Sequence, residues 1–192
     1  GSTTSKINTV LEGCGDPKIL TMCLIYLLAG AFASVAAAMG AVESVVNLGL
    51  TFISPEMLPV GIFLLAAFLS TATGTSVGSI VALGPIVIGL ADQSGVSLVL
   101  LSATLLGGSM FGDNLSFISD TTIAATQSLG VKMKDKFKMN FFIALPTALI
   151  TILILFFLGQ NSEGTGILIT GGDYSFFKII PYLLVIVLSI IG

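Results

Sequence analysis

The stretch FGDNLSFISDTT, residues 111–122, concentrates polar side chains within a strongly apolar chain. It contains two carboxylates, Asp113 and Asp120, together with one amide and four hydroxyl groups. Carboxylate, amide and hydroxyl oxygens are the hard ligands that magnesium and calcium prefer, and the same reasoning applies to sodium and lithium. The stretch therefore predicts a binding site for a small cation. Its candidate ligands are Asp113, Asn114, Ser116, Ser119, Asp120 and Thr121.

Two placements of these carboxylates are open. A charged side chain near the centre of a membrane helix costs about 2.5–3.5 kcal/mol even on a lenient insertion scale, which disfavours contact with lipid. Either the carboxylates face a polar cavity, or the segment lies at the membrane surface, where Asp113 would cap a helix with Ser116 at its third position. The apolar run before the stretch and the absence of further charge until Lys132 favour the cavity.

A second polar stretch, TATGTSVGS at residues 71–79, interrupts the apolar run at residues 58–91. The apolar halves on either side are too short to span a membrane separately at full thickness. Two interrupted helices that meet near the bilayer midplane form the recurring binding site of secondary transporters. Thr73, Thr75 and Ser76 therefore join the candidate ligands.

Glycines bear on where these helices break. A membrane helix can break only where its bared backbone lines protein or water. The glycines at 107–112 predict a break just before Asp113, with the unpaired carbonyls of the preceding helix turned toward the gap. The alternative is packing, because the Gly-x-x-x-Gly patterns at 74–78 and 108–112 match the spacing that lets membrane helices approach closely.

The chain as a whole is too apolar to cover itself with polar surface in water. Of its 192 residues, 55% are hydrophobic and 9% are charged, whereas soluble domains carry about 25% charged residues. Long apolar runs recur at residues 19–39, 58–91, 96–112, 141–158 and 177–191. We therefore predict an all-α integral membrane protein, a bundle of transmembrane helices with interrupted or re-entrant helices near the midplane.

Other features limit the possible functions. We interpret residues 1–17 as a cloning remnant of two residues and a polar lead-in, and residues 18–192 as a single membrane domain. Cys14 and Cys23 are expected to be ordinary thiols, and without histidine the familiar zinc and Cys–His arrangements are missing. No nucleophile–base pair, phosphate-binding loop or basic aromatic patch occurs, so the sequence predicts neither an enzyme nor a nucleic-acid-binding protein.

The distribution of charge predicts an orientation in the inner (plasma) membrane. Lysines at 132, 134, 136 and 138 form a basic cluster, which we place on the cytoplasmic side near anionic lipid. Residues 160–176 are Gly-rich and acidic, and we place them on the opposite side. Glu43, in the short apolar segment 42–52, is expected at the interface, with a buried proton carrier as the alternative.

Four strings of residues resemble the NhaC-type sodium/proton antiporter family, which belongs to a broader ion-transporter group. They are LAGAFASVAAAMGAV (28–42), GTSVGSIVAL (74–83), GGSMFGDNLSFISDTTIAAT (107–126) and DKFKMN (135–140). The resemblance runs from about residue 17 to the end of the sequence. It places the acidic motif of the family on the six candidate ligands of 113–121, and its hydroxyl-rich break on residues 73–79.

The resemblance implies a carrier built from two related halves that exchanges sodium for protons, with some relatives coupling ions to small organic acids. Family members are much longer than this chain. We therefore expect the chain to resemble one half of a transporter, which would pair with a second copy of itself or with a missing second half. Membrane lipid is the other expected partner.

Together, the residues and the resemblance predict exchange of Na⁺ for H⁺ by competition at one carboxylate, with these ions and no cofactor. Asp113 ranks first, because it is predicted to follow a helix break directly, and Asp120 ranks second. One alternative is a sodium-coupled carrier of small carboxylates such as malate or lactate, held at helix N-termini beginning at Ser76 or Ser119. Another is a non-transporting membrane module or assembly scaffold, which would show no ion-dependent stability.

Overall fold

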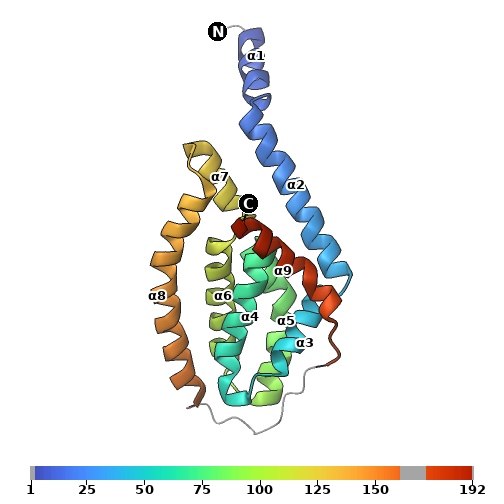
Figure 1. The fold of residues 1–192 in the computed structure, drawn as a ribbon, viewed down its shortest axis with the longest axis vertical. Coiled ribbons are helices and arrows are strands. Elements are labelled where there is room, and N and C mark those ends of the chain that lie inside the picture. The colour runs from blue at the N-terminus through green and yellow to red at the C-terminus, as the bar shows by residue number, and fades with distance from the viewer. Residues whose placement is uncertain (1–2, 161–171, 192) are drawn as a thin grey trace.

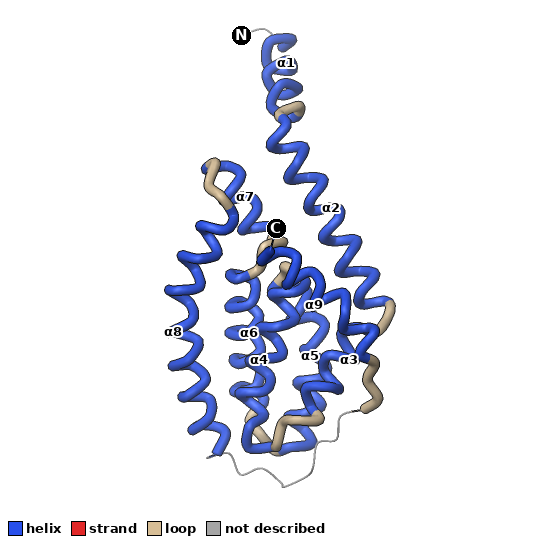
Figure 2. Tube along the Cα trace, viewed as in Figure 1, coloured by secondary structure: helices blue, strands red, loops and turns tan. Residues whose placement is uncertain are grey.

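The computed structural model describes residues 3–160 and 172–191, which fold into helices joined by short turns (Figure 1). The helices are α1 (Thr3–Cys14), α2 (Pro17–Ala38), α3 (Ala41–Leu50), α4 (Leu58–Thr73), α5 (Ser76–Ser94), α6 (Leu98–Leu115), α7 (Asp120–Leu129), α8 (Met133–Gln160) and α9 (Phe176–Ile191), with a short 3-10 helix, η1 (Pro55–Met57), before α4. Within the described ranges no strand occurs (Figure 2). The all-α prediction is confirmed.

Several of these helices suit a bilayer better than water. Those long and apolar enough to cross a membrane are Ile19–Ala38, Ser76–Ser94, Leu98–Leu129 and Met133–Gln160. Large apolar side chains face outward from α2 and α8, as Leu27 and Leu153 show with 72% and 58% of their surface exposed. Water penalises such surfaces, whereas lipid matches them. At 19 residues α5 is itself long enough to cross, so the expectation that both halves of the run 58–91 are too short is wrong for the second half.

The helix α4 lies inside the bundle and is buried along most of its length. Beside it, α6 packs through two glycines. A Cβ at Gly108 would collide with the Phe63 carbonyl, and a Cβ at Gly112 would collide with the Ala67 carbonyl. This confirms the packing interpretation of 108–112. The predicted helix break at these glycines is wrong, because α6 continues through them to Leu115.

A tight turn at Gly74 and Thr75 joins α4 to α5, which returns alongside α4 toward the lower end of the bundle (Figure 1). Gly74 ends α4 with a φ of 73°, a left-handed conformation that glycine adopts without steric penalty. Thr75 caps α5, because its Oγ1 accepts a hydrogen bond of 3.2 Å from the Gly78 N–H. The chain therefore leaves the helix within residues 71–79 but reverses there, so α5 does not continue α4 across the bundle.

The link between α6 and α7, residues 116–119, lies against this turn. The Ser116 Oγ donates to the Thr71 carbonyl at 2.8 Å and accepts from the Ile118 N–H at 3.2 Å. A Cβ at Gly74 would lie 2.8 Å from the Ile118 carbonyl oxygen. The two polar stretches of the sequence thus meet at their helix ends. Their depth in the bilayer stays a prediction.

The remaining helices complete the bundle. Gly130 ends α7 with a φ of 65°, and α8 then runs back along the bundle. Tyr182 of α9 is fully buried and packs edge-on against Phe32 with ring centroids 5.9 Å apart. The segment predicted to face the far side, residues 160–176, lies mostly outside the described residues. Glu43 is exposed in the first turn of α3, which does not support the alternative of a buried proton carrier.

Candidate cation site

Asp113 lies half-buried in the last turn of α6 and points one oxygen at α5. Its Oδ2 accepts a hydrogen bond of 3.0 Å from the Oγ of Ser76, the first residue of α5. Its Oδ1 is buried and has no hydrogen-bond partner among the described residues. The carboxylate therefore lies near a helix N-terminus, whose dipole favours negative charge, and keeps one oxygen free.

This placement corrects one expectation about Asp113 and removes one alternative. It precedes the helix break, since residues 116–119 are the first to leave the helix, and it does not follow a break. It also does not cap a surface helix with Ser116 at the third position, because it belongs to the C-terminal end of α6.

One lysine of the basic cluster also reaches this region. The Lys136 Nζ donates to the Asn114 carbonyl and to the Thr122 Oγ1, both at 2.6 Å, and lies within electrostatic range of the Asp113 carboxylate. The Asn140 Nδ2, one turn further along α8, donates to the same Asn114 carbonyl at 3.1 Å. Lysines 132, 134 and 138 are exposed, whereas Lys136 is half-buried.

The sequence alone does not single out Lys136. Lys136 and Asn140 stand four residues apart, so they share one face of a helix. However, Lys132 and Lys134 also have a polar residue four positions further on, in Lys136 and Lys138, so this spacing does not distinguish Lys136. Cluster composition alone could not distinguish them.

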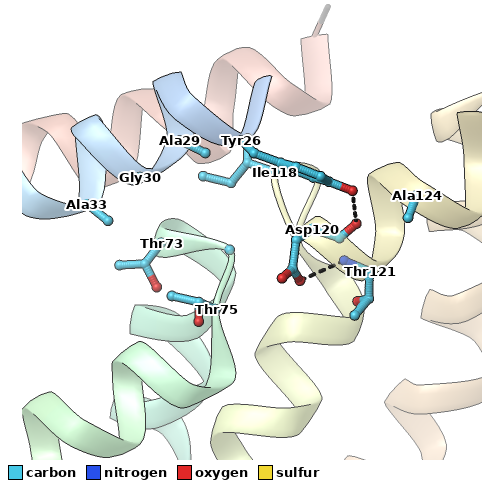
Figure 3. Close-up of a pocket in the computed structure, with 11 residues that line it drawn as sticks. Tyr26, Ala29, Gly30, Ala33, Thr73, Thr75, Ile118, Asp120, Thr121 and Ala124 are labelled. Carbon is cyan, nitrogen blue, oxygen red and sulfur yellow. Dashed lines mark hydrogen bonds between the residues drawn. The ribbon is translucent and has the colours of Figure 1, made fainter. Parts of the chain in front are cut away.

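Asp120 occupies different surroundings (Figure 3). It is exposed at the first position of α7, where its Oδ1 accepts from the Thr121 N–H at 2.7 Å and its carbonyl accepts from the Tyr26 hydroxyl at 2.9 Å. It lines a cavity of about 470 Å³ between α2, the α4–α5 turn and the start of α7. We call this the Asp120 cavity. Its lining is Tyr26, Ala29, Gly30, Ala33, Thr73, Gly74, Thr75, Ile118, Asp120, Thr121 and Ala124.

A smaller cavity of about 250 Å³ shares Thr73 and Thr75 with the Asp120 cavity. It also touches Ser79 and the buried Tyr182, whose hydroxyl has no partner among the described residues. The Ser79 Oγ donates to the Thr75 carbonyl at 3.0 Å. Residues with hydroxyl groups therefore line both cavities beside the α4–α5 turn.

The nine predicted ligands consequently divide into groups. Asp113 and Ser76 are joined by a hydrogen bond, whereas Asp120, Thr121, Thr73 and Thr75 line the Asp120 cavity. Three others make local contacts: the Asn114 amide donates to the Met110 carbonyl, Ser116 binds Thr71, and the Ser119 and Thr121 hydroxyls lie 2.9 Å apart. Their roles as ligands stay predictions.

The described residues contain no group of three or more His, Cys, Asp or Glu side chains that could hold a metal ion. A cation beside Asp113 would therefore have one carboxylate and otherwise neutral oxygens around it. Such a ligand set suits a monovalent cation better than a divalent one, because divalent sites of proteins usually gather several carboxylates.

These features define an all-helical, multi-pass membrane protein in which two helix ends and a carboxylate meet inside the bundle. Comparison with known proteins identifies the family. The Na⁺/H⁺ antiporter family matches residues 3–160, and the chain belongs to this family.

The chain is similar to several curated proteins. It is 28% identical to the malate-2H⁺/Na⁺-lactate antiporter of Bacillus subtilis, across 94% of this chain and 41% of that protein. It is 31% identical to an uncharacterized Na⁺/H⁺ antiporter of Haemophilus influenzae, across 77% of this chain and 31% of that protein. It is 28% identical to the Na⁺/H⁺ antiporter NhaC of Alkalihalophilus pseudofirmus, across 64% of this chain and 26% of that protein.

The chain thus spans less than half the length of each of these relatives. No solved structure matches it significantly.

Proposed function

We propose that this chain forms part of a secondary transporter that exchanges Na⁺ for H⁺ at the Asp113 carboxylate. Membership of the Na⁺/H⁺ antiporter family supports the reaction. The observation that carries the choice of residue is the buried, unpartnered Oδ1 of Asp113 beside the Ser76 hydrogen bond. A buried carboxylate oxygen without a partner is unfavourable unless an ion, a proton or water satisfies it.

Competition at one carboxylate couples the two ions. A nearby cation favours the ionised form of a carboxylate, so Na⁺ binding expels the proton. A bound proton removes the charge that attracts Na⁺. A site that holds one ion at a time, and that faces each side of the membrane in turn, therefore exchanges the two ions.

Thermal unfolding of the chain in detergent tests this proposal at a high and a low pH. At about 100-fold excess over Kd, a ligand that binds only the folded state adds about 2.7 kcal/mol to the free energy of unfolding. We expect Na⁺ to stabilise the protein more at high pH, because protons occupy the carboxylate at low pH. Asp113→Asn should retain the fold and lose the sodium response. Equal responses in both proteins, or a response independent of pH, would contradict the proposal.

The proposed orientation places the lysine cluster, residues 132–138, in the cytoplasm of a cell whose inner membrane holds the protein. The excess of lysine in this segment supports it. Maleimide labelling of intact cells with a single cysteine at Lys134 tests it. Protection from an impermeant reagent is expected, and labelling from outside would reverse the orientation. A second copy of the chain, or a second half of the transporter, is the proposed protein partner.

Exchange that involves small carboxylates is the second candidate function. The similarity to a malate-2H⁺/Na⁺-lactate antiporter across 94% of this chain favours it. The Asp120 cavity, at about 470 Å³, has the volume of a small-molecule site and adjoins the N-cap of α5. However, Asp120 itself would repel an anion unless a proton or Na⁺ neutralised it. Uptake of sodium in competition with malate and lactate distinguishes the two functions, since only the second predicts an effect of these acids.

A further inference from the structure

Four buried side-chain oxygens lack a hydrogen-bond partner in the described part of the chain: Ser70 Oγ, Ser109 Oγ, Asp113 Oδ1 and Tyr182 OH. A buried polar atom left unpaired costs about 1–3 kcal/mol. Unpaired atoms of this kind in native structures call for an explanation, such as an unseen water or ion. Tyr182 lines the smaller of the two cavities, whereas the other three oxygens belong to the packed helices α4 and α6.

Helix geometry places these three oxygens around one junction. Ser109 and Asp113 stand four residues apart on α6, so their side chains share one face. The hydrogen bond from Ser76 shows that α5 begins beside that face. On the adjoining face of α6, a Cβ at Gly112 would lie 2.9 Å from the Cβ of Ser70, which brings Ser70 of α4 to the same level.

We propose that Ser70 and Ser109 supply neutral oxygen ligands to the sodium ion that Asp113 binds. The ion would lie where α4, α5 and α6 meet, held by Asp113 Oδ1, Ser109 Oγ and Ser70 Oγ, while Ser76 holds the other carboxylate oxygen. This inference rests on the proposed function and adds two ligands to it. Both serine side chains are fully buried, with 0% of their surface exposed, so they are shielded from bulk water.

The proposal predicts an unusual energetic signature. Without sodium the two hydroxyls are unsatisfied, so their removal should leave the sodium-free protein equally stable or more stable. When sodium is bound, the two hydroxyl oxygens coordinate the ion and so strengthen its binding to the folded protein. A hydroxyl that acts structurally would behave in the opposite way, because its loss would weaken the sodium-free fold and leave the sodium response unchanged.

The test compares Ser70→Ala and Ser109→Ala with Asp113→Asn and a matched control in the full chain in detergent. Thr104→Val is the control, because Thr104 is a buried hydroxyl of the same helix that donates to the Leu100 carbonyl at 2.8 Å. Melting temperature is titrated with NaCl at high pH, with choline chloride keeping the ionic strength constant. Each serine variant should keep the sodium-free melting temperature and need about tenfold more sodium for the same shift.

Thr104→Val should lower the sodium-free melting temperature and respond to sodium as the unsubstituted chain does. Ser109→Cys supplies a second variant, because sulfur is close to oxygen in position but is a poor ligand for a hard cation. It should weaken the sodium response as Ser109→Ala does.

The outcomes separate this inference from the proposed function. If Asp113→Asn loses the sodium response while both serine variants titrate like the unsubstituted chain, the serines are not ligands and the proposed function stands. If the serine variants lower the sodium-free melting temperature as Thr104→Val does, without changing the sodium titration, their role is structural. If Asp113→Asn retains the response, or the unsubstituted chain has none, both proposals fail.

Discussion

The two carboxylates of the opening stretch lie in contrasting parts of the molecule. Asp113 sits on a helix that packs backbone to backbone against α4, with its carboxylate bound by Ser76 and its helix end held by Lys136. Asp120 is exposed at the start of α7 and lines a cavity whose other wall is α2. Most of α2 is itself exposed.

This contrast shows that local sequence does not assign a role to a carboxylate. The two identical side chains stand seven positions apart, yet one faces a junction of three packed helices and the other faces an open cavity. A bare cation needs oxygens held at fixed positions, and we propose that it finds them where α4, α5 and α6 meet around Asp113, here called the Asp113 junction. An open cavity suits the entry of ions or a larger ligand. The following predictions test this division.

The largest effect is expected where the Asp113 junction is packed most tightly. Gly112→Leu should lower the free energy of unfolding by about 3 kcal/mol or more, because its Cβ would collide with the Ala67 carbonyl and α4 would have to move. Chemical denaturation in detergent measures this change. Gly107→Leu is the control, since a Cβ there meets only the far end of the Phe63 ring, at 3.9 Å. Similar losses in both variants would contradict the packing interpretation.

Asp120→Asn compares the two carboxylates directly. If sodium binds at the Asp113 junction, this variant should retain most of the roughly 2.7 kcal/mol of stabilisation that about 100-fold excess sodium provides. Sodium titration of the melting temperature is the measurement, beside Asp113→Asn. A variant of Asp120 that lost the whole response would move the primary site into the Asp120 cavity.

Gly74 belongs to both regions, because it lines the Asp120 cavity and touches the link that follows α6. Gly74→Ala should destabilise the protein by about 2 kcal/mol, since alanine is strained at a φ of 73° and its Cβ would press on Ile118. Gly89→Ala, within α5, should change stability by less than about 1 kcal/mol, because no atom lies within 4 Å of its Cβ and alanine favours the helix. The unfolding midpoints of the two variants measure this difference in stability. Equal losses of stability in the two variants would contradict the conclusion that the left-handed turn at residue 74 requires glycine.

Lys136→Gln should separate fold stability from ion affinity. Loss of a charged donor to Asn114 and Thr122 should lower stability by about 1–3 kcal/mol. Loss of a positive charge near Asp113 should strengthen sodium binding by about 1 kcal/mol, or roughly fivefold. Lys138→Gln, at an exposed position of the same cluster, should change neither. Weaker sodium binding in Lys136→Gln would show that the lysine supports the site in another way.

The smallest effect is expected at Tyr26. Tyr26→Phe removes the hydroxyl that donates to the Asp120 carbonyl at 2.9 Å, which should lower stability by about 0.5–1 kcal/mol. The sodium response should be unchanged, because this contact belongs to the Asp120 cavity. A large change in sodium affinity would show that α2 and the Asp113 junction are coupled.

Much of this protein follows from its sequence. Composition and apolar runs determine a helical membrane protein. Only lipid matches so much apolar surface, and a chain can cross the bilayer only if its backbone N–H and C=O groups are hydrogen-bonded within the protein, as they are in a helix. Local turn chemistry places the ends of α4 at Gly74 and of α7 at Gly130, since glycine alone accepts a left-handed conformation without penalty. The motif in residues 111–122 also leads to the antiporter family, which the comparison with known proteins confirms.

Tertiary structure decided what local patterns left open. Glycines at 108 and 112 can either break a helix or pack it, and only the presence of α4 beside them selects packing. Among four nearby lysines, only the position of α8 against the end of α6 selects Lys136. Ser70 and Ser109 have no distinguishing pattern in the sequence, because an unpaired oxygen is defined by what surrounds it. Those surroundings come from helices far apart along the chain.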